Sequence, residues 1–316
     1  MPDNQQSLPM LVFVGVATQD AIGVVDRYPQ QDERIVAEEL LFAGGGPAAT
    51  AAVAAARLGM RTAVVAVIGD DEEGVKIVHD LATEGVDVSG IQTSSSERSA
   101  RSLVIISGPD KSRAIVNRPG PFLSLQNNER GRELIEGASW VHVDQHGWAA
   151  TRAHLDELGY PPRLSVDAGN PIPGYRAANT ELYAPTRDAL IERYARPDTA
   201  NDIESLLYRA TGDGARIAVA TGGADGSFAF SHESGAVRAP APRAGIVSTL
   251  GAGDVFHGAL LAGLTLAENG VLPGGLADAL AYATAAASLS CRGIDGRSQI
   301  PSHDETMLWV ASMAPR

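Results

Sequence analysis

The segment VSTLGAGDVFHGAL, residues 247–260, places one acid directly after a turn of small residues. The apolar stretch before the turn ends at Gly251, Ala252 and Gly253. Asp254 begins a segment whose apolar residues have helical spacing. Free backbone N–H groups and the helix dipole at the start of a helix favour a bound anion such as phosphate. A carboxylate beside that anion would repel it, so we expect Asp254 to be a general base that takes a proton from a hydroxyl attacking a phosphoryl group. The alternative is that Asp254 only caps the helix.

The composition excludes several other classes of function. The 316 residues carry a formal net charge of −13, whereas a generic nucleic-acid binder would need a basic face. Cys291 is the only cysteine, which rules out an internal disulfide and a cysteine-based zinc site. The seven histidines show no metal-ligand spacing, so no metal held by protein side chains is expected. The segment MPDNQQSLPM has neither a basic region nor a long apolar core, and we expect a cytoplasmic protein without a membrane segment.

The elements that must position the turn are strands and helices that alternate along the chain in βαβ order. Apolar strand patterns alternate with helical patterns, which predicts an α/β fold with a mainly parallel central sheet covered by helices. The predicted strands lie at 11–17, 62–71, 140–144, 163–170 and 216–226, and the predicted helices at 47–59, 73–86 and within 251–291. No long linker or repeat interrupts residues 1–316, so a single domain is expected. Ligands of such sheets bind beyond the carboxyl ends of the strands, where the 251–253 turn is expected.

Residues 98–118 break this rhythm. Two strand patterns flank the turn GPDK with no helix between them, which predicts a β-hairpin rather than a crossover. We expect the hairpin to leave the main sheet and to form a small lid with strands from residues 18–42, where the pattern at 33–42 leads into a run of glycines. An open flap of this kind would expose its edges, so we also expect a homodimer joined through the lid strands.

Two stretches resemble the signatures of a known family. FAGGGPAATAAVAAARLG, residues 42–59, is similar to the amino-terminal glycine-rich signature of the ribokinase-like (pfkB-type) carbohydrate kinases. STLGAGDVFHGALLAGL, residues 248–264, is similar to their carboxyl-terminal signature, and the resemblance covers essentially the whole chain. It implies a ribokinase-like three-layer sandwich with a small β-strand lid. It also implies ATP-dependent phosphorylation of a sugar hydroxyl, with Mg²⁺.

The resemblance indicates roles for individual residues. It implies Asp254 as the catalytic base and the 251–253 turn as the anion hole. The candidates for nucleotide binding are Thr221, Gly223, Gly226, Thr249, Gly251 and Gly253. The candidates for sugar binding are Asp20, Gly45, Gly46, Thr50, Asn117, His146, Asp254 and His257. Arg101 and Arg118, on the predicted lid strands, are interpreted either as a clamp for an anionic group or as solvent-facing residues.

Other polar residues keep alternative roles. Asp167 and Asn170 end a predicted middle strand and either face the cleft or hold a turn. His257 lies one turn beyond Asp254 on the same helix face and either contacts the sugar or is a hydrogen-bonded structural residue. His142 lies inside an apolar strand pattern and is expected in the core.

The sequence departs from the family pattern at several positions. Ser248 stands where the second signature usually has an aspartate linked to a monovalent-cation site, so a requirement for K⁺ is left open. The N-x-x-E element that helps to organise Mg²⁺ has no match in residues 184–190, and Mg²⁺ is expected to rest on nucleotide phosphates and water. The signatures look most like the subgroup that contains 6-deoxy-6-sulfofructose kinase, but VDQHGW, residues 143–148, lacks the arginine that holds the sulfonate there. A ketose, a sugar acid and a sulfosugar therefore stay open as substrates.

Two alternative functions use the same fold. A nucleoside kinase would need an apolar or aromatic clamp for its base, and only 5% of the residues are aromatic. A non-catalytic sugar sensor on a kinase scaffold could lose its base, whereas Asp254 is retained. A Rossmann-type dinucleotide enzyme is disfavoured, because VGVATQD stands where G-x-G-x-x-G would follow the first strand.

Overall fold

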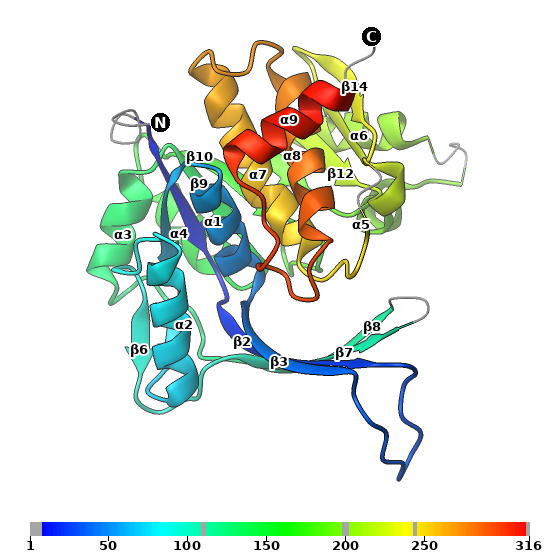
Figure 1. Ribbon diagram of the computed structural model, residues 1–316. Coiled ribbons are helices and arrows are strands. Elements are labelled where there is room, and N and C mark those ends of the chain that lie inside the picture. Colours follow the sequence, from blue (N-terminus) through cyan, green and yellow to red (C-terminus); the bar gives the residue numbers. More distant parts are fainter. Residues whose placement is uncertain (1–7, 109–111, 198–201, 243–244, 314–316) are drawn as a thin grey trace.

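The computed structural model describes residues 8–108, 112–197, 202–242 and 245–313, which fold around one large β-sheet (Figure 1). Within this part of the chain the strand order is β14-β13-β12-β11-β10-β9-β1-β4. Neighbours from β4 to β12 along this order are parallel, and β13 and β14 pair antiparallel at the other edge. The prediction of a mainly parallel central sheet is confirmed. The strands are β1 (Met10–Val14), β4 (Arg61–Val65), β9 (Trp140–Val143), β10 (Arg163–Asp167), β11 (Thr180–Ala184), β12 (Ala215–Thr221), β13 (Ser227–Ser231) and β14 (Gly235–Ala239).

Helices cover both faces of this sheet, because its central strands are apolar on both sides. In β1, Leu11 and Phe13 contact one helical layer, and Val12 and Val14 contact the other. The first layer contains α1 (Pro47–Arg57), α2 (Glu72–Thr83), α7 (Ala252–Glu268), α8 (Leu276–Ser290) and α9 (His303–Met313). The second layer contains α3 (Glu129–Glu136), α4 (Trp148–Asp156), α5 (Arg187–Tyr194) and α6 (Ile203–Gly212). The predicted three-layer sandwich is therefore confirmed.

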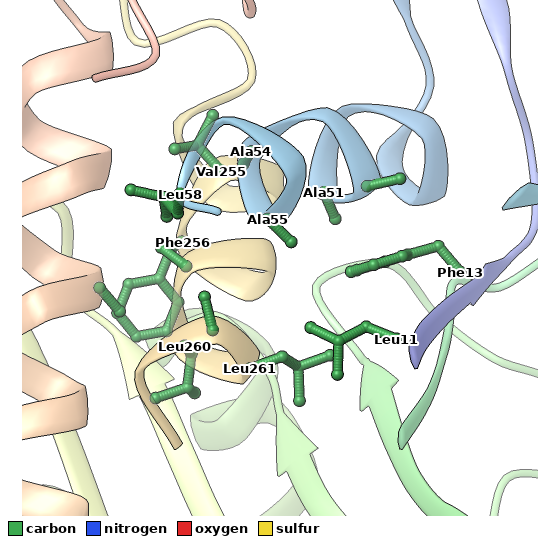
Figure 2. Packing of buried hydrophobic residues seen from close by; sticks show 14 of the residues in the cluster. Leu11, Phe13, Ala51, Ala54, Ala55, Leu58, Val255, Phe256, Leu260 and Leu261 are labelled. Carbon is green, nitrogen blue, oxygen red and sulfur yellow. The ribbon is translucent and has the colours of Figure 1, made fainter. Parts of the chain in front are cut away.

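The alanine-rich helix α1 packs closely against α7. Figure 2 shows side chains of β1, α1 and α7 meeting in one apolar core. Gly258 of α7 lies directly against α1, where a Cβ atom would come within 2.1 Å of the Ala51 carbonyl oxygen. Small residues on both helices thus permit a close backbone approach. This packing fixes the start of α7, and with it the position of Asp254.

A second sheet stands apart from the main body as a lid (Figure 1). Its strand order is β3-β2-β7-β8. Ile22, Val104 and Ile106 are buried on its inner face, whereas Leu40 and Phe42 are 75% and 68% exposed on its outer face. The lid strands are β2 (Thr18–Val25), β3 (Glu39–Gly45), β7 (Arg101–Ser107) and β8 (Arg113–Arg118), and a separate short pair is formed by β5 (Val67–Gly69) and β6 (Gln92–Ser94).

Several strand boundaries differ from the expectation. The strand expected at 62–71 is divided between β4 of the main sheet and β5 of the short pair, and the strands expected at 11–17, 163–170 and 216–226 end at Val14, Asp167 and Thr221. The strand expected at 33–42 begins at Glu39 and continues to Gly45, because its glycines also pair with β2. The strands β7 and β8 lie within 98–118, and residues 109–111 of the predicted turn lie outside the described residues. No helix in the described part of the chain is long and apolar enough to cross a membrane.

Candidate active site

The start of α7 forms an uncapped turn of backbone N–H groups beside the carboxyl ends of β11 and β12. Gly251 is the N-cap residue, with a left-handed φ of 73°, and no side chain in the described part of the chain caps the helix. A Cβ atom on Gly251 would lie 2.7 Å from the Gly296 Cα atom, so both the conformation and the space require glycine. The first turn therefore presents N–H groups and the positive end of the helix dipole, which is the arrangement that binds an anion.

Asp254 lies in the first turn of α7, three residues after the N-cap, and makes no capping hydrogen bond. Burial raises the pKa of its carboxyl from the ordinary 3.8 to about 7. The charges of Asp167 and Asp144 raise the pKa further, and the charge of His257 opposes them. A carboxyl with a pKa near neutrality can both take up and release a proton, which suits a general base better than a helix cap.

A buried ion pair lies close to Asp254. His257 Nε2 is 3.3 Å from Asp167 Oδ1, and both side chains are almost completely buried. Burial lowers the pKa of His257, but Asp167 and then Asp254 outweigh burial and raise that pKa above its ordinary value. Burial raises the pKa of Asp167, yet the charge and hydrogen bond of His257 outweigh burial and lower it to about 2. Asp167 and Asp254 therefore favour the protonated form of His257, whose charge opposes the rise in the pKa of Asp254.

His142 lies in the core next to this pair, where the sequence places it. Its Nδ1 atom is 2.9 Å from Ser165 Oγ, and its ring centroid is 5.2 Å from that of His257. Burial, followed by the charge of His257, lowers the pKa of His142 to about 3. His142 is thus neutral and contributes packing rather than charge.

Asp20 lies on the inner face of the lid. Its Oδ1 atom accepts a hydrogen bond from Thr18 Oγ1 at 2.7 Å, and burial raises its pKa. Cross-strand register aligns Asp20 with Ser102 and Ser102 with Asn117, so the three residues share this face. A Cβ atom on Gly45 would lie 2.1 Å from Asp20 Oδ2, so the backbone of Gly45 is packed directly against the carboxylate. The structure thus brings three of the expected sugar-binding residues together with one that was not expected, Ser102.

The structure does not bring Arg101 and Arg118 to this inner face. They form the neighbouring cross-strand pair, and successive residues of a strand point to opposite faces. Arg101 Nη1 lies 2.5 Å from Glu73 Oε1, and Arg118 Nη2 donates to the Ser99 carbonyl oxygen at 2.9 Å. The side chain of His146 is exposed. Both arginines are therefore held by other protein groups on the far side of the lid. They do not form the expected clamp for an anionic group.

A cavity of about 810 Å³ lies beside the start of α7. Its lining includes five of the residues assigned to nucleotide binding, namely Thr221, Gly223, Gly226, Thr249 and Gly253. Arg113, which the sequence analysis did not single out, reaches the cavity from β8 and donates from Nη1 to Thr249 Oγ1 at 2.9 Å. A cavity of this size next to an anion-binding helix start fits a nucleoside triphosphate.

Metal-ion binding by side chains alone is not supported. Among the residues that the structure describes, no group of three or more His, Cys, Asp or Glu side chains could hold a metal ion. Ser248 Oγ accepts a hydrogen bond from the Leu250 N–H at 3.1 Å, which gives this side chain a role in the turn itself.

Two buried residues of the site escaped the sequence analysis. Asp144 follows β9 and accepts hydrogen bonds from the N–H groups of Val16 at 2.8 Å and Ala48 at 3.4 Å, so it ties the loop after β1 to the start of α1. Arg297 lies in the loop between α8 and α9 and is only 8% exposed. An acid at the end of the strand pattern WVHVD was a usable signal for Asp144. Nothing in the glycine-rich segment GIDGR indicated a buried arginine.

The predicted residues Gly46 and Thr50 lie at the start of α1. Gly46 is the N-cap residue of this helix, and Thr50 follows one turn later. Thr50 Oγ1 accepts a hydrogen bond from Arg297 Nε at 3.2 Å. The start of α1, the lid strand β3 and the loop after α8 therefore meet beside Asp20.

Comparisons with known proteins agree with this geometry. The model of the family described as pfkB family carbohydrate kinase matches residues 8–159 and 170–302. The deoxyribokinase of Salmonella typhi is 25% identical over 313 residues, which cover 93% of this chain and 96% of the relative. A crystal structure of a putative ribokinase from Agrobacterium tumefaciens has a TM-score of 0.82 and 25% identity, and covers 98% of this chain and 99% of its own. The Arabidopsis thaliana ribokinase complexed with ribose and ATP has a TM-score of 0.77 at 22% identity, covers 96% of this chain and 98% of its own, and supports the fold alone.

Proposed function

The chain belongs to the pfkB family of carbohydrate kinases, and on this premise we propose that it transfers the γ-phosphoryl group of ATP to a hydroxyl of a sugar. The observation that carries the proposal is the position of Asp254. This carboxyl, with a pKa near 7, lies in the uncapped first turn of α7, whose residues Ala252 and Gly253 line the 810 Å³ cavity. The base, the anion-binding turn and the cavity beside it are parts that phosphoryl transfer requires.

The proposed reaction follows from these parts. Asp254 takes the proton of the acceptor hydroxyl, whose oxygen forms a bond to the γ-phosphorus while the bond from that phosphorus to the β,γ-bridging oxygen breaks and ADP leaves. The N–H groups of the 251–253 turn stabilise the charge on the transferring phosphoryl group. Mg²⁺ bound to the nucleotide phosphates would neutralise charge on them. The pair His257–Asp167 keeps a positive charge near Asp254 and limits the rise of its pKa.

The first test is an ADP-release assay with purified protein, ATP and Mg²⁺, with and without K⁺. The panel contains neutral ketoses and aldoses, sugar acids, 6-deoxy-6-sulfofructose and nucleosides. Turnover on a sugar supports the proposal. Turnover on nucleosides alone would identify a nucleoside kinase, and absence of turnover with intact ATP binding would favour a sugar sensor.

The second test isolates the base. Asp254→Asn should abolish turnover by about 1,000-fold or more while both ligands still bind, because only the proton acceptor is removed. Asp188 is a matched control, since it is an exposed acid in the first turn of α5. Asp188→Asn should leave turnover unchanged. Equal turnover in Asp254→Asn and the wild type would remove Asp254 from the role of base.

The lid supports the expectation of a homodimer. Its outer face exposes Leu40 and Phe42 together with Leu103 and Val116, and an apolar groove of about 340 Å³ runs beside them. Monomeric proteins rarely leave such a contiguous apolar surface in water. We propose that a second copy of the chain covers this face. The ketose, sugar-acid and sulfosugar alternatives, and the location of the protein in the cytoplasm, stay predictions.

A further inference from the structure

A fully buried carboxylate holds together three segments at the carboxyl edge of the main sheet. Asp144 directly follows β9 and is 0% exposed. Its Oδ2 atom accepts hydrogen bonds from the N–H groups of Val16 at 2.8 Å and Ala48 at 3.4 Å. Its Oδ1 atom accepts hydrogen bonds from the N–H groups of His146 at 2.8 Å and Gly147 at 3.0 Å. Four main-chain donors therefore meet at one side chain.

The four donors fit an ionised carboxylate. All of them are N–H groups, so a carboxyl proton would find no acceptor among them. Ala48 lies in the first turn of α1 and Gly147 is the N-cap residue of α4, and neither helix has a side-chain hydrogen bond at its own N-cap in the described part of the chain. The positive ends of both helix dipoles favour a negative charge at Asp144. Burial raises the pKa of Asp144, and the hydrogen bonds from Val16, Gly147 and His146 oppose that rise.

The space around this carboxylate is closed. A Cβ atom on Gly15 would lie 2.2 Å from both oxygens of Asp144. A Cβ atom on Gly46, the N-cap residue of α1, would lie 2.4 Å from the Val16 carbonyl oxygen. The loop after β1 and the start of α1 therefore touch each other directly beside Asp144. Because the packing leaves no room, a change at this carboxylate must displace both segments.

The two segments held by Oδ2 lead to the two sides of the proposed reaction. Val16 is followed by β2, which carries Asp20, the residue proposed to hold the sugar. Ala48 belongs to α1, and α1 packs closely against α7, whose first turn carries Asp254 (Figure 2). Asp144 thus connects the strand that carries the sugar-binding acid to the helix that supports the base.

We propose that Asp144 is a positioning residue for phosphoryl transfer, which aligns the acceptor hydroxyl with Asp254 through the main chain and keeps a further negative charge near this base. The inference rests on the proposed function and deepens it. Asp144 is too deeply buried to contact a sugar, so it acts through the segments that it holds. A base must lie within hydrogen-bond reach of the proton that it takes, and a misplacement of about 1 Å can slow a reaction by about 100-fold.

The charge of Asp144 gives this role a signature of its own. After desolvation, the groups that act on the pKa of Asp254 are Asp167, His257, Asp144 and Arg297. The two acids raise this pKa, and the two basic groups lower it. Removing the charge of Asp144 should therefore lower the pKa of Asp254. Because the ionised base is the active form, the rise of kcat/KM with pH should then move to lower pH.

The test measures kcat and kcat/KM against pH for the wild type and Asp144→Asn, on the sugar with the highest turnover. Asparagine keeps the shape, removes the charge and turns an NH₂ group toward N–H donors. We expect kcat to fall about 100-fold and the rise of kcat/KM to move to lower pH. A higher KM with unchanged kcat would indicate direct sugar contact and overturn the proposal. An unshifted pH profile would leave only a structural residue and would also overturn it.

Asp71→Asn is the matched control for a merely structural carboxylate. Asp71 is the N-cap residue of α2 and accepts hydrogen bonds from the N–H groups of Gly74 and Ser99, both at 2.9 Å. Among the described residues, the charges that act on Asp254 do not include Asp71. Its replacement should lower stability and leave kcat and the pH profile unchanged. The same shift of the profile in Asp71→Asn and Asp144→Asn would contradict the proposal.

A second variant displaces the carboxylate and keeps its charge. Gly15→Ala places a methyl group 2.2 Å from the oxygens of Asp144, which must then leave their N–H donors. The loss of kcat should resemble that of Asp144→Asn, with a smaller shift of the pH profile, and an unchanged kcat would refute the positioning role. In the Asp144→Ala background, Gly15→Ala should cost little more, because the vacated space receives the methyl group. This variant also covers the case in which Asp144→Asn fails to fold.

The outcome is distinguishable from that of the proposed function. If the wild type phosphorylates no sugar, the proposed function fails, and carbon-detected NMR titration still measures the pKa of Asp254 in the wild type and Asp144→Asn. The Asp254→Asn variant assigns the signal, and an unchanged pKa would overturn the inference. If a sugar is phosphorylated and Asp144→Asn changes neither kcat nor the pH profile, kinase function stands and the inference fails.

Discussion

Replacing Asp254 with asparagine should stabilise the folded protein above neutral pH. The half-buried carboxyl feels the charges of Asp167 and Asp144, which together with desolvation raise its pKa from the ordinary 3.8 to about 7. A raised pKa means that the folded state disfavours the ionised form relative to the unfolded chain. Asparagine has nearly the same shape without the charge. A general base in this position is thus held at a cost to stability.

The size and the pH window of the effect follow from the pKa. Well below pH 3.8 the carboxyl is protonated in both states, and it contributes no difference. From about pH 4 to pH 7 the unfolded chain ionises first, so wild-type stability falls relative to the variant by up to about 1.4 kcal/mol per pH unit. Above pH 7 the difference reaches a plateau. Because Asp254 keeps some solvent contact, we expect a plateau on the order of 2–4 kcal/mol.

The assay is urea unfolding followed by circular dichroism at pH 5, 6, 7 and 8, on the wild type, Asp254→Asn and Asp188→Asn. If Asp254 served only as an acid at a helix start, its removal would destabilise the protein by about 0.3–1 kcal/mol, as is expected for Asp188. The two interpretations of Asp254 therefore predict opposite signs. An Asp254→Asn variant that is less stable than the wild type at pH 8, or one whose advantage does not grow with pH, would refute the reasoning.

Three further predictions concern the base, the anion-binding turn and the lid. The kcat/KM of the wild type should rise about tenfold per pH unit up to about pH 7, as Asp254 ionises. His257→Gln should shift this rise to higher pH, because a positive charge near Asp254 is lost. An unshifted pH profile would show that His257 does not affect the pKa of Asp254. Gly251→Val should lower kcat by about 100-fold or more, because it distorts the backbone N–H groups that face the phosphoryl group. Sugar binding measured by calorimetry should be retained. An unchanged kcat would contradict the role of this turn in stabilising the phosphoryl group. Phe42→Asp should yield a monomer in sedimentation velocity, and an unchanged dimer would exclude the lid interface.

The parts of the fold that depend on local patterns could be predicted from the sequence. The alternation of strands and helices indicated the parallel sheet, because each strand and each helix has its own pattern of apolar residues that the fold must bury. The glycine turn before Asp254 was recognisable because the left-handed conformation of Gly251 and the following helix are local features. These are also the parts in which the structure agrees with the expectation.

The face of each lid strand could not be predicted in the same way. A shift of one residue in strand register moves every side chain to the other face. Asn117 and Arg118 are sequence neighbours, yet one shares a face with Asp20 and the other is held by Ser99 on the opposite face. The burial of Arg297 could not be predicted either, because its hydrogen-bond partner Thr50 precedes it by 247 residues in the sequence. No local pattern encodes a contact of that range.

The loop after α8 connects the two halves of the proposed site. Gly296 packs its backbone directly against Gly251, which forms the N-cap of the anion-binding turn. The next residue, Arg297, reaches in the other direction to Gly45 and Thr50 beside the lid. Because one short loop packs against both the N-cap of α7 and the start of α1, substitutions at Gly251 or Arg297 should each disturb the relative position of these two helix starts.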